Sequence, residues 1–241
     1  MQAPLRLIIV GRGKMAQMME RECARGFDAS GVLGYQRVDG VPFPLNFPRE
    51  SIVVHVSSKE RLPGVVEECE KYNLPLIQAS SGQTKLISKD VKIPVIDAPN
   101  LSLEIVALFD VLPRLGKLIQ EAGSDVHVCE SHQHTKTSPP ITAHTIAGFF
   151  GKMPESVQSI RDIEVQTAIL GVSGEHIGGH GYHYVKIVGE GGSEIILQTK
   201  INGRLPYFYG ALAVARKILE IKATLAPGIY PIDKFMFGDV K

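Results

Sequence analysis

The sequence predicts an α/β protein in which a parallel sheet covered by helices is followed by a smaller α+β domain. Two observations favour this arrangement. Through the first hundred residues, short apolar runs alternate with segments whose apolar residues recur at helical spacing, as in parallel α/β folds. After Asn100 the strict alternation ends, and two strand candidates follow one another directly. We therefore expect the first domain to cover residues 1–103 and the second to begin at residue 104.

The first domain contains strand candidates separated by helix candidates. Each strand candidate is apolar on both faces, which is typical of a parallel sheet buried between helices. The helix candidates carry apolar residues at helical spacing, and Gly26 is the expected C-cap of the first one. The strands are expected within residues 6–11, 31–38, 51–58, 74–82 and 93–100, and the helices within residues 14–26 and 61–73.

The second domain mixes helices and strands without a fixed order. We expect a helix over residues 101–123, which Pro113 should kink or divide because it lacks the backbone N–H of an interior position. The sequence "GEGGS" (189–193) is typical of a turn that joins two antiparallel strands. The remaining elements are expected to be strands at 125–133, 180–190 and 193–203 and helices at 141–151 and 205–222.

The charge balance argues against several classes of partner. The chain has 26 Lys and Arg against 25 Asp and Glu, so it offers no strong positive charge to attract nucleic acid. Its longest apolar runs are too short to span a bilayer, and its N-terminus lacks the pattern of a secretory signal. The three cysteines form neither a disulfide framework nor a metal-binding spacing. We expect a cytoplasmic protein with no nucleic-acid or membrane partner.

A glycine-rich turn lies between the first expected strand and the first expected helix. The sequence "GRGKMA" fits G-x-G-x-x-A, in which the first glycine allows a tight turn and the second lets a pyrophosphate approach the backbone. The N–H groups that open the helix then face the phosphates. This context predicts a Rossmann-type dinucleotide-binding domain, and a tight turn without a ligand is the alternative. The expected cofactor-binding residues here are Gly11, Arg12, Gly13, Lys14 and Met15.

The end of the second strand should select between NAD and NADP. In such domains an acidic residue here binds the ribose 2′-hydroxyl of NAD, whereas an arginine accommodates the 2′-phosphate of NADP. The strand ends in Gln36 and Arg37, which favours NADP, while Asp39 follows further out and keeps NAD as an alternative. We therefore expect NADPH or NADH as the cofactor, with Arg37 among the residues that bind it.

A polar stretch from Glu130 to Thr145 is the main candidate for the reaction site. Its sequence, "ESHQHTKTSPPITAHT", contains His132 and Lys136 four residues apart, a spacing that lets both side chains face one pocket in a turn or short helix. A histidine near neutrality can donate a proton, and a lysine can stabilise developing negative charge. From the pattern alone, a solvated polar loop is the alternative.

Several segments, in the same order along the chain, resemble one enzyme family. They are "VGRGKMAQMM" in the glycine-rich turn, "QASSG" (78–82), "APNLSL" (98–103), the polar stretch itself and "GVSGEHIGGHGYHYVKI" (171–187). Together they resemble the dihydrodipicolinate reductases of lysine and diaminopimelate biosynthesis over nearly the whole chain. The resemblance implies hydride transfer from NADPH or NADH to a cyclic dicarboxylate, dihydrodipicolinate, within a homotetramer. It also implies that the chain returns to the first domain at about residues 220–241 and that residues 104–219 serve substrate binding and oligomerisation.

The resemblance also implies roles for individual residues. His132 and Lys136 correspond to the family's catalytic pair. His176, His180 and His183 match the family's own pattern, so we expect no metal site there despite their H-x3-H-x2-H spacing. The further cofactor-binding residues that the resemblance implies are Ser57, Ala79, Ser81, Ala98 and Asn100. The implied substrate-binding residues are Gln133, Lys136, Ile141, Thr142 and Ser81.

The chain departs from the family pattern where a substrate carboxylate should bind. Pro140 and Ile141 replace the family's Ser-Gly before Thr142, and Ser138 replaces an aspartate. Proline supplies neither an N–H nor a hydroxyl, so the expected carboxylate site has lost two donors. A reductase of another cyclic imine-type substrate, or a catalytically silent nucleotide-binding protein, is therefore an alternative. His55 also replaces a family acid, a change that the sequence does not explain.

Overall fold

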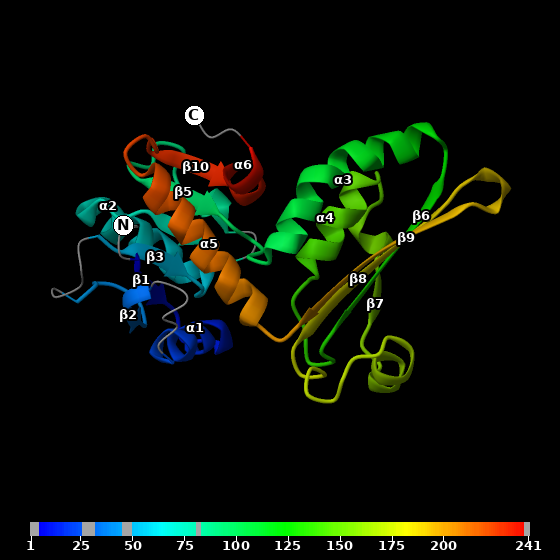
Figure 1. The fold of residues 1–241 in the computed structure, drawn as a ribbon, viewed down its shortest axis with the longest axis horizontal. Coiled ribbons are helices and arrows are strands. Elements are labelled where there is room, and N and C mark those ends of the chain that lie inside the picture. Colours follow the sequence, from blue (N-terminus) through cyan, green and yellow to red (C-terminus); the bar gives the residue numbers. More distant parts are fainter. Residues whose placement is uncertain (1–4, 26–31, 45–49, 81–82, 239–241) are drawn as a thin grey trace. The chain divides into compact units, whose positions relative to one another are not determined.

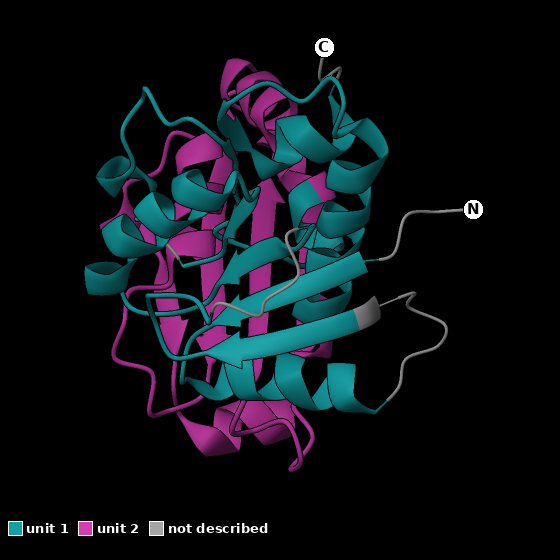
Figure 2. Ribbon diagram, turned by 90° about the vertical axis from the view of Figure 1, so that its left-hand side faces the viewer, with its two compact units in different colours: residues 1–106, 207–241 teal, residues 107–206 magenta. Residues whose placement is uncertain are grey.

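The computed structural model describes residues 5–25, 32–44, 50–80 and 83–238, and the chain forms two compact units. Unit 1 consists of residues 1–106 and 207–241, and unit 2 of residues 107–206 (Figures 1 and 2). Unit 1 holds a parallel sheet covered by helices, and unit 2 holds a separate mixed sheet, so the predicted fold class is confirmed. Gly26, the expected helix C-cap, lies outside the described residues.

Unit 1 is organised around a six-stranded sheet. Its strands are β1 (Leu5–Val10), β2 (Val32–Val38), β3 (Ile52–His55), β4 (Leu76–Gln78), β5 (Pro94–Asp97) and β10 (Gly228–Pro231). They pair in parallel in the order β10-β5-β4-β3-β1-β2 (Figure 1). The chain therefore passes from β1 to a neighbour on one side and later to β3 on the other. Such a reversal of strand order marks the point where α/β sheets bind ligands, at the carboxyl ends of the strands.

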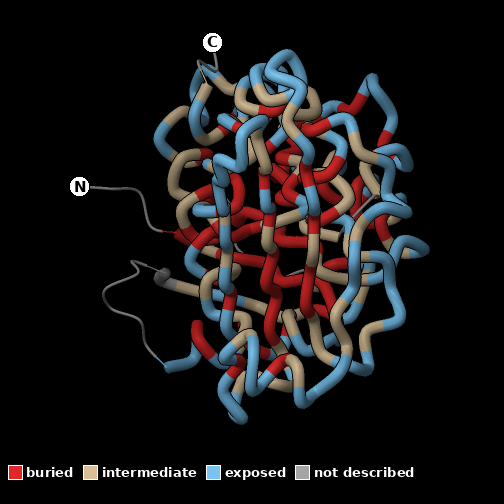
Figure 3. The backbone as a smooth tube through the Cα atoms, turned by 90° about the vertical axis from the view of Figure 1, so that its right-hand side faces the viewer, coloured by how far each residue is buried: buried red, intermediate tan, exposed pale blue. Residues whose placement is uncertain are grey.

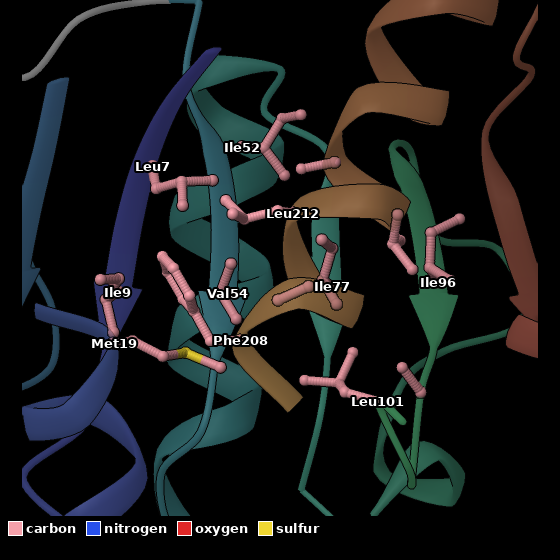
Figure 4. Packing of buried hydrophobic residues seen from close by; sticks show 14 of the residues in the cluster. Leu7, Ile9, Met19, Ile52, Val54, Ile77, Ile96, Leu101, Phe208 and Leu212 are labelled. Carbon is pink, nitrogen blue, oxygen red and sulfur yellow. The ribbon is translucent and has the colours of Figure 1, made fainter. Parts of the chain in front are cut away.

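Helices cover both faces of this sheet. They are α1 (Lys14–Ala24), α2 (Leu62–Tyr72), α5 (Leu205–Ile221) and α6 (Ile232–Phe237), with short 3-10 turns at Lys59–Arg61 and Thr84–Leu86. On one face, Leu7 and Ile9 pack in a core with residues of α1, α5 and α6 (Figure 4). On the other face, Ile8 and Val10 pack with Val65 and its neighbours on α2. Alternate residues of β1 thus enter two separate cores, which is why its sequence is apolar except at Arg6.

Unit 2 contains a four-stranded sheet in the order β7-β6-β8-β9. The strands are β6 (Asp125–His132), β7 (Gln158–Ile160), β8 (His180–Val188) and β9 (Glu194–Asn202), and the helices are α3 (Leu103–Glu121) and α4 (Ile141–Phe149), with a 3-10 turn at Pro154–Ser156. β6, β8 and β9 are antiparallel, whereas β7 pairs in parallel with β6. Val128 and Val185 pack on one face of this sheet against Leu112 of α3 and Ile146 of α4. Figure 3 shows buried residues, in red, along the middle strands and exposed residues, in pale blue, along the surrounding loops.

α3 is a single helix that continues through Pro113, so the expected division at this residue is wrong. A proline inside a helix removes one backbone hydrogen bond. Leu112 and Leu115, on either side of Pro113, pack into the core of unit 2, and this apolar burial offsets the loss. Neither α3 nor any other helix within the described ranges is both long and apolar enough to cross a membrane.

The chain returns to unit 1 earlier than the resemblance implied. The return comes at Tyr207 and not at about residue 220, because α5 packs Phe208 and Leu212 into the core of unit 1. Two strands that the sequence pattern missed are β7 and β10. They have three and four residues, and their sequences, QSI and GIYP, contain polar residues or glycine and proline in place of an apolar run.

Gly116 of α3 lies directly against the end of α4. A Cβ atom added to Gly116 would lie 2.0 Å from the backbone oxygen of Phe149, so any side chain there must push the two helices apart. We expect Gly116→Ala to lower the free energy of unfolding by about 1–3 kcal/mol, the usual cost of overpacking. Chemical denaturation followed by circular dichroism measures the change.

Gly148→Ala, in α4, is the matched control. A Cβ atom at Gly148 would meet no atom within 4 Å, and alanine has the higher helix propensity. The control should therefore be neutral or stabilise the protein by up to about 1 kcal/mol. Equal effects of the two substitutions would contradict the close approach of α3 to α4 as the cause.

Candidate active site

His132 is the last residue of β6, and a buried carboxylate fixes the orientation of its ring. The Nδ1 atom of His132 lies 2.6 Å from Oε2 of Glu130, two residues earlier on the same strand. The residue opposite His132 in β8 is Gly181, where an added Cβ would lie 3.3 Å from Nε2 of His132. Glycine at this position therefore leaves room for the ring. With Nδ1 engaged, Nε2 is the ring atom that can exchange a proton with a substrate.

Glu130 is fully buried, and hydrogen bonds reach both of its carboxylate oxygens. Oε1 accepts a bond of 2.6 Å from Nη2 of Arg161 and another from the hydroxyl of Ser159, while Oε2 is bonded to His132. Burial by itself would raise the pKa of Glu130. The hydrogen bonds from His132, Arg161 and Ser159 outweigh it and lower this pKa to about 2. The carboxylate is therefore charged near neutral pH.

A short π-helix, Val165–Ile169, is hydrogen-bonded to the ends of β6 and β7, the two strands that carry this cluster. Its residue Gln166 is fully buried. The side-chain nitrogen of Gln166 donates hydrogen bonds to the backbone oxygens of His132 at 2.7 Å and Ile160 at 3.0 Å. These bonds tie the end of β6 to the end of β7. π-helices occur frequently at functional sites, so the position agrees with a functional role for the cluster.

Two further histidines lie on β8 beside His132. His183 Nδ1 lies 2.9 Å from Thr199 Oγ1, and its ring makes an edge contact with the ring of His132, with 5.9 Å between centroids. Burial, and next the charge of His132, lower the pKa of His183 to about 4, so His183 is neutral near pH 7. His180 Nε2 lies 2.9 Å from the hydroxyl of Ser131. In the part of the chain that the structure describes, no group of three or more His, Cys, Asp or Glu is arranged to hold a metal ion.

The loop after β6 carries the second expected catalytic residue. The backbone N–H of Lys136 donates to the oxygen of Gln133 at 2.9 Å, which closes a turn, and Nζ donates to the hydroxyl of Ser138 at 2.8 Å. The pKa of Lys136 is lowered, mainly by burial. The negative charge of Glu130 opposes this effect, and the positive charge of Arg161 adds to it. The ammonium of Lys136 therefore interacts electrostatically with the cluster around Glu130. The hydrogen bonds described above join His132 to Glu130 and Lys136 to Ser138, and not the two expected catalytic side chains to each other.

The start of α4 offers fewer donors than the family pattern implies. The backbone N–H of Ile141 donates to the oxygen of Pro139 at 3.0 Å, so this donor is used within the chain. A substrate carboxylate would have to displace that bond before Ile141 could bind it. The side chain of Ile141 is 41% exposed, and Thr142 lies partly buried in the first turn of the helix. The expected substrate-binding residues here are thus close in space but differ in what they can donate.

In unit 1, the glycine-rich turn follows β1 at the point where the strand order reverses. Gly11 has a φ of +154°, and a Cβ atom there would lie 2.9 Å from the oxygen of Val56 and 3.2 Å from Cβ of Ala16. A Cβ atom at Gly13 would meet nothing within 4 Å. Within the described part of unit 1, no side chain caps the N-terminus of α1. A crowded first glycine, an open second glycine and an uncapped helix start fit the pyrophosphate of a dinucleotide.

Arg37, the residue expected to select the cofactor, is held by two carboxylates. Its Nε lies 2.5 Å from Oε2 of Glu20, and its Nη1 lies 3.2 Å from Oδ1 of Asp39. Asp39 also pairs with Arg12 at 3.0 Å. The hydrogen bond to Glu20 is the main cause that raises the pKa of Arg37. Arg37 and Asp39, the two alternatives for recognising the ribose, therefore belong to one ion-pair network at the end of β2.

The other expected cofactor-binding residues lie at the same edge of the sheet. Because all the strands are parallel, the residues that follow them gather at their carboxyl ends. Lys14 and Met15 open α1, Ser57 follows β3, Ala79 follows β4, and Ala98 and Asn100 follow β5. Ser81 lies outside the described residues.

His55, at the end of β3, belongs to a buried polar network. Its Nδ1 lies 2.8 Å from Oε1 of Gln78 on the neighbouring β4. Gln78 Nε2 donates to the oxygen of Ser80 at 2.6 Å, and the Ser80 hydroxyl donates to the oxygen of Ser57 at 2.7 Å. Burial lowers the pKa of His55, so the ring stays neutral. In place of the family acid, His55 thus joins the ends of two strands through hydrogen bonds.

The sequence predicts His132 and Lys136 as candidate catalytic residues, but it does not predict the side chains that surround His132. Ser159, Arg161 and Gln166 come from a later segment that carries no motif. Glu130 stands in the same polar stretch, two residues before His132. Alternate residues of a strand share a face, so this spacing is the one available signal that the carboxylate and the ring are neighbours.

Known proteins are similar to this one over most of its length. No protein-family model matches it. The chain is 28% identical to a 4-hydroxy-tetrahydrodipicolinate reductase of Caldanaerobacter subterraneus subsp. tengcongensis, with 95% of this chain and 97% of that protein covered. It is 24% identical to a protein of the same name from Rhodopirellula baltica, with 83% and 78% covered. The solved structure of a dipicolinate-bound dihydrodipicolinate reductase from Paenisporosarcina sp. TG-14 matches in fold, with a TM-score of 0.64 and 14% identity over 96% of this chain and 99% of that one.

The neutral, buried His183 makes the stability of the protein sensitive to acid. Its pKa falls from 6.5 to about 4 on folding, so the unfolded chain binds this proton first as the pH falls. The free energy of unfolding therefore decreases by on the order of 3 kcal/mol as the pH falls from 6.5 to 4. We expect His183→Gln to remove most of this loss, measured by denaturant unfolding at about pH 7 and about pH 4.5. An unchanged pH dependence in the variant would assign the acid sensitivity to another group.

Proposed function

We propose that the chain is a member of the family of 4-hydroxy-tetrahydrodipicolinate reductases, and that His132 and Lys136 carry out the reduction of dihydrodipicolinate. The protein is an oxidoreductase of lysine and diaminopimelate biosynthesis. The observation that carries the proposal is the orientation of His132. Its side chain is 19% exposed, and Glu130 holds Nδ1 so that Nε2 is left for the substrate.

The reaction needs a hydride and a proton. When bound, a nicotinamide cofactor would supply the hydride that the unsaturated ring of the substrate accepts. The substrate ring then carries an additional electron pair, and Nε2 of His132 donates to it the proton that completes the reduction. Throughout this step Nδ1 keeps its bond to Glu130, which prevents the ring from turning away. His132 regains a proton from solvent before the next turnover.

Lys136 supplies positive charge to the same reaction. Its ammonium attracts a dianionic substrate and stabilises the negative charge that develops during hydride transfer. The hydrogen-bond partner of Nζ is Ser138, a neutral group. The family's aspartate at this position would pair with the ammonium, so serine leaves more of the charge for the substrate. Gln133 and Thr142 are proposed to add neutral hydrogen-bonding groups to the substrate site.

One observation favours a second candidate, the reduction of another cyclic imine-type substrate. Pro140 has neither a hydroxyl nor an N–H, and the N–H of Ile141 is bonded to Pro139. A second substrate carboxylate therefore meets fewer donors, whereas a monocarboxylate has no need of them. Turnover of enzymatically generated dihydrodipicolinate is compared with turnover of cyclic imines that carry a single carboxylate. A higher kcat/KM for the dicarboxylate supports the first candidate, and the reverse order supports the second.

We propose that the glycine-rich turn binds NADPH or NADH, and NADPH at least as well as NADH. Gly11 and Gly13 allow the phosphates to approach the backbone. Arg12 and Arg37 place two guanidinium groups at the end of β2, where the adenosine ribose is expected, and Asp39 is the alternative ribose ligand. The residues proposed to line the rest of the cofactor site are Lys14, Met15, Ser57, Ala79, Ser81, Ala98 and Asn100.

We also propose a cytoplasmic homotetramer. The family resemblance suggests this assembly, and two large apolar side chains of unit 2 agree with it. Ile169 and Ile196 are 74% and 65% exposed in the single chain, and association with further copies would bury such side chains. Light scattering of the purified protein measures the mass of the assembly.

The catalytic pair is tested by substitution. We expect His132→Ala to lower kcat by about 10²–10⁴-fold, since it removes the proton donor. Lys136→Ala should lower kcat/KM by about 10²-fold or more, because a charged stabilising group is lost. Cofactor oxidation is followed by absorbance with enzymatically generated dihydrodipicolinate. His134→Ala, which changes an exposed histidine of the same loop, should keep the wild-type rate. Full activity in either main variant would remove that residue from the mechanism.

The choice of cofactor is tested by a matched pair of substitutions at the end of β2. Arg37→Ala should weaken NADPH binding by about 1–3 kcal/mol and NADH binding by less, if the guanidinium contacts the 2′-phosphate. Asp39→Asn should leave NADPH binding unchanged or improve it, because one competing carboxylate becomes neutral. Dissociation constants come from the fluorescence of the bound reduced cofactor. Equal losses for both cofactors in Arg37→Ala, with a selective loss of NADH in Asp39→Asn, would make Asp39 the ribose ligand.

A further inference from the structure

We propose that Arg161, acting through Glu130, sets the alkaline limit of the reaction, and that both are positioning residues for His132. The inference rests on the proposed role of His132 as proton donor. Arg161 Nη2 lies 2.6 Å from Glu130 Oε1, and Glu130 Oε2 lies 2.6 Å from His132 Nδ1. The three side chains thus form a continuous row of guanidinium, carboxylate and imidazole, in which only the imidazole has to meet the substrate.

The row is built from two paired strands and is held at both ends. Glu130 lies beside Ser159 in the parallel pairing of β6 with β7, and Ser159 donates to the same carboxylate oxygen as Arg161. Arg161 follows β7 directly, and its Nη1 donates to the backbone oxygen of the preceding residue at 2.9 Å. Gln166 bonds to both strand ends and so keeps His132 in place. The pairing of β6 with β7 therefore fixes the distances between the Arg161, Glu130 and His132 side chains.

The charge of Arg161 decides how strongly Glu130 retains the proton on His132. Glu130 is 0% exposed, so water screens its charge weakly. While Arg161 is bonded to it, the carboxylate keeps a cationic partner whether the imidazole is neutral or charged. Without Arg161, compensation of the buried carboxylate would depend on the imidazolium alone, so loss of the cation should favour the charged form of the pair.

The other titratable groups around His132 differ from Arg161 in charge or in contact. On β8, the ring of His183 contacts that of His132, whereas His180 bonds to Ser131. Burial lowers the pKa of both His180 and His183, so both are neutral near pH 7. In the loop after β6, Lys136 is a cation, but its ammonium bonds to a hydroxyl. Among the described residues, Arg161 is the permanent cation that is hydrogen-bonded to Glu130.

The test compares the pH dependence of kcat in two variants that remove opposite charges. Proton donation requires the protonated ring, so kcat falls as the pH rises through proton release from His132. Glu130→Gln removes the anion, and the alkaline fall in kcat should move to lower pH by about 1 unit. Arg161→Gln removes the compensating cation, and the fall should move to higher pH by about 0.5–1 unit.

Two further variants act as controls. Arg161→Lys keeps a cation at this place and should restore a profile close to that of the wild type. Arg114→Gln changes an exposed arginine on α3 and should leave the profile as it is. Shifts of Glu130→Gln and Arg161→Gln in the same direction, or lower kcat at every pH without a shift, would overturn the proposal. A merely structural role predicts loss of activity and no opposite displacement.

A second measurement requires neither turnover nor folding of a charge variant. Nitrogen-15 NMR of histidine-labelled wild-type protein shows which ring nitrogen of neutral His132 carries the proton. The bond to Glu130 predicts the proton on Nδ1 and a bare Nε2, and the opposite tautomer would overturn the proposal. A wild-type protein with the Nδ1–H tautomer that reduces no cyclic imine would reject the proposed function while supporting the Glu130–His132 arrangement.

Discussion

Burying an ionised carboxylate is costly unless hydrogen bonds and opposite charge replace the water that it loses, and in unit 2 this constraint falls on Glu130. The chain meets it with Arg161, Ser159 and His132, which together bond both oxygens. These partners come from the ends of two paired strands and from the residue that follows one of them. Satisfying a single charge therefore aligns β6 with β7. The same bonds orient the ring that is proposed to donate the proton, so structure and chemistry share one requirement.

A second constraint organises unit 1. A parallel sheet collects the residues that follow its strands at one edge, and the reversal of strand order opens that edge beside β1. Gly11 has to be glycine because a Cβ atom there would meet the oxygen of Val56 at 2.9 Å. Gly13 has open space in front of it, so its place in the motif is explained by what approaches from outside. Polar side chains such as His55 and Gln78 then tie neighbouring strand ends together by hydrogen bonds.

The departures from the family pattern gain a physical meaning once their contacts are known. Serine at position 138 bonds to the ammonium of Lys136 without cancelling its charge. Proline at position 140 is the N-cap residue of α4, and the N–H of Ile141 donates to the oxygen of Pro139. Compared with the family pattern, position 138 carries a neutral hydroxyl in place of a carboxylate, and position 140 carries neither an N–H nor a hydroxyl. In the proposed reaction, that combination would keep the electrostatic attraction to an anionic substrate and weaken the geometric selection of a second carboxylate.

The order of elements in unit 1, the glycine-rich turn and the residues His132 and Lys136 can be inferred from the sequence, because periodicity and short motifs are local properties. The path of α3 through Pro113 and the early return of the chain at Tyr207 cannot, because packing against distant residues decides them. The same is true of the ion pairs that join Arg37 to Glu20 and Asp39. Arg161 is the clearest case. Nothing in its own neighbourhood of the sequence marks it, and it becomes part of the site only because β7 pairs with β6 and places its guanidinium beside a carboxylate that water cannot reach.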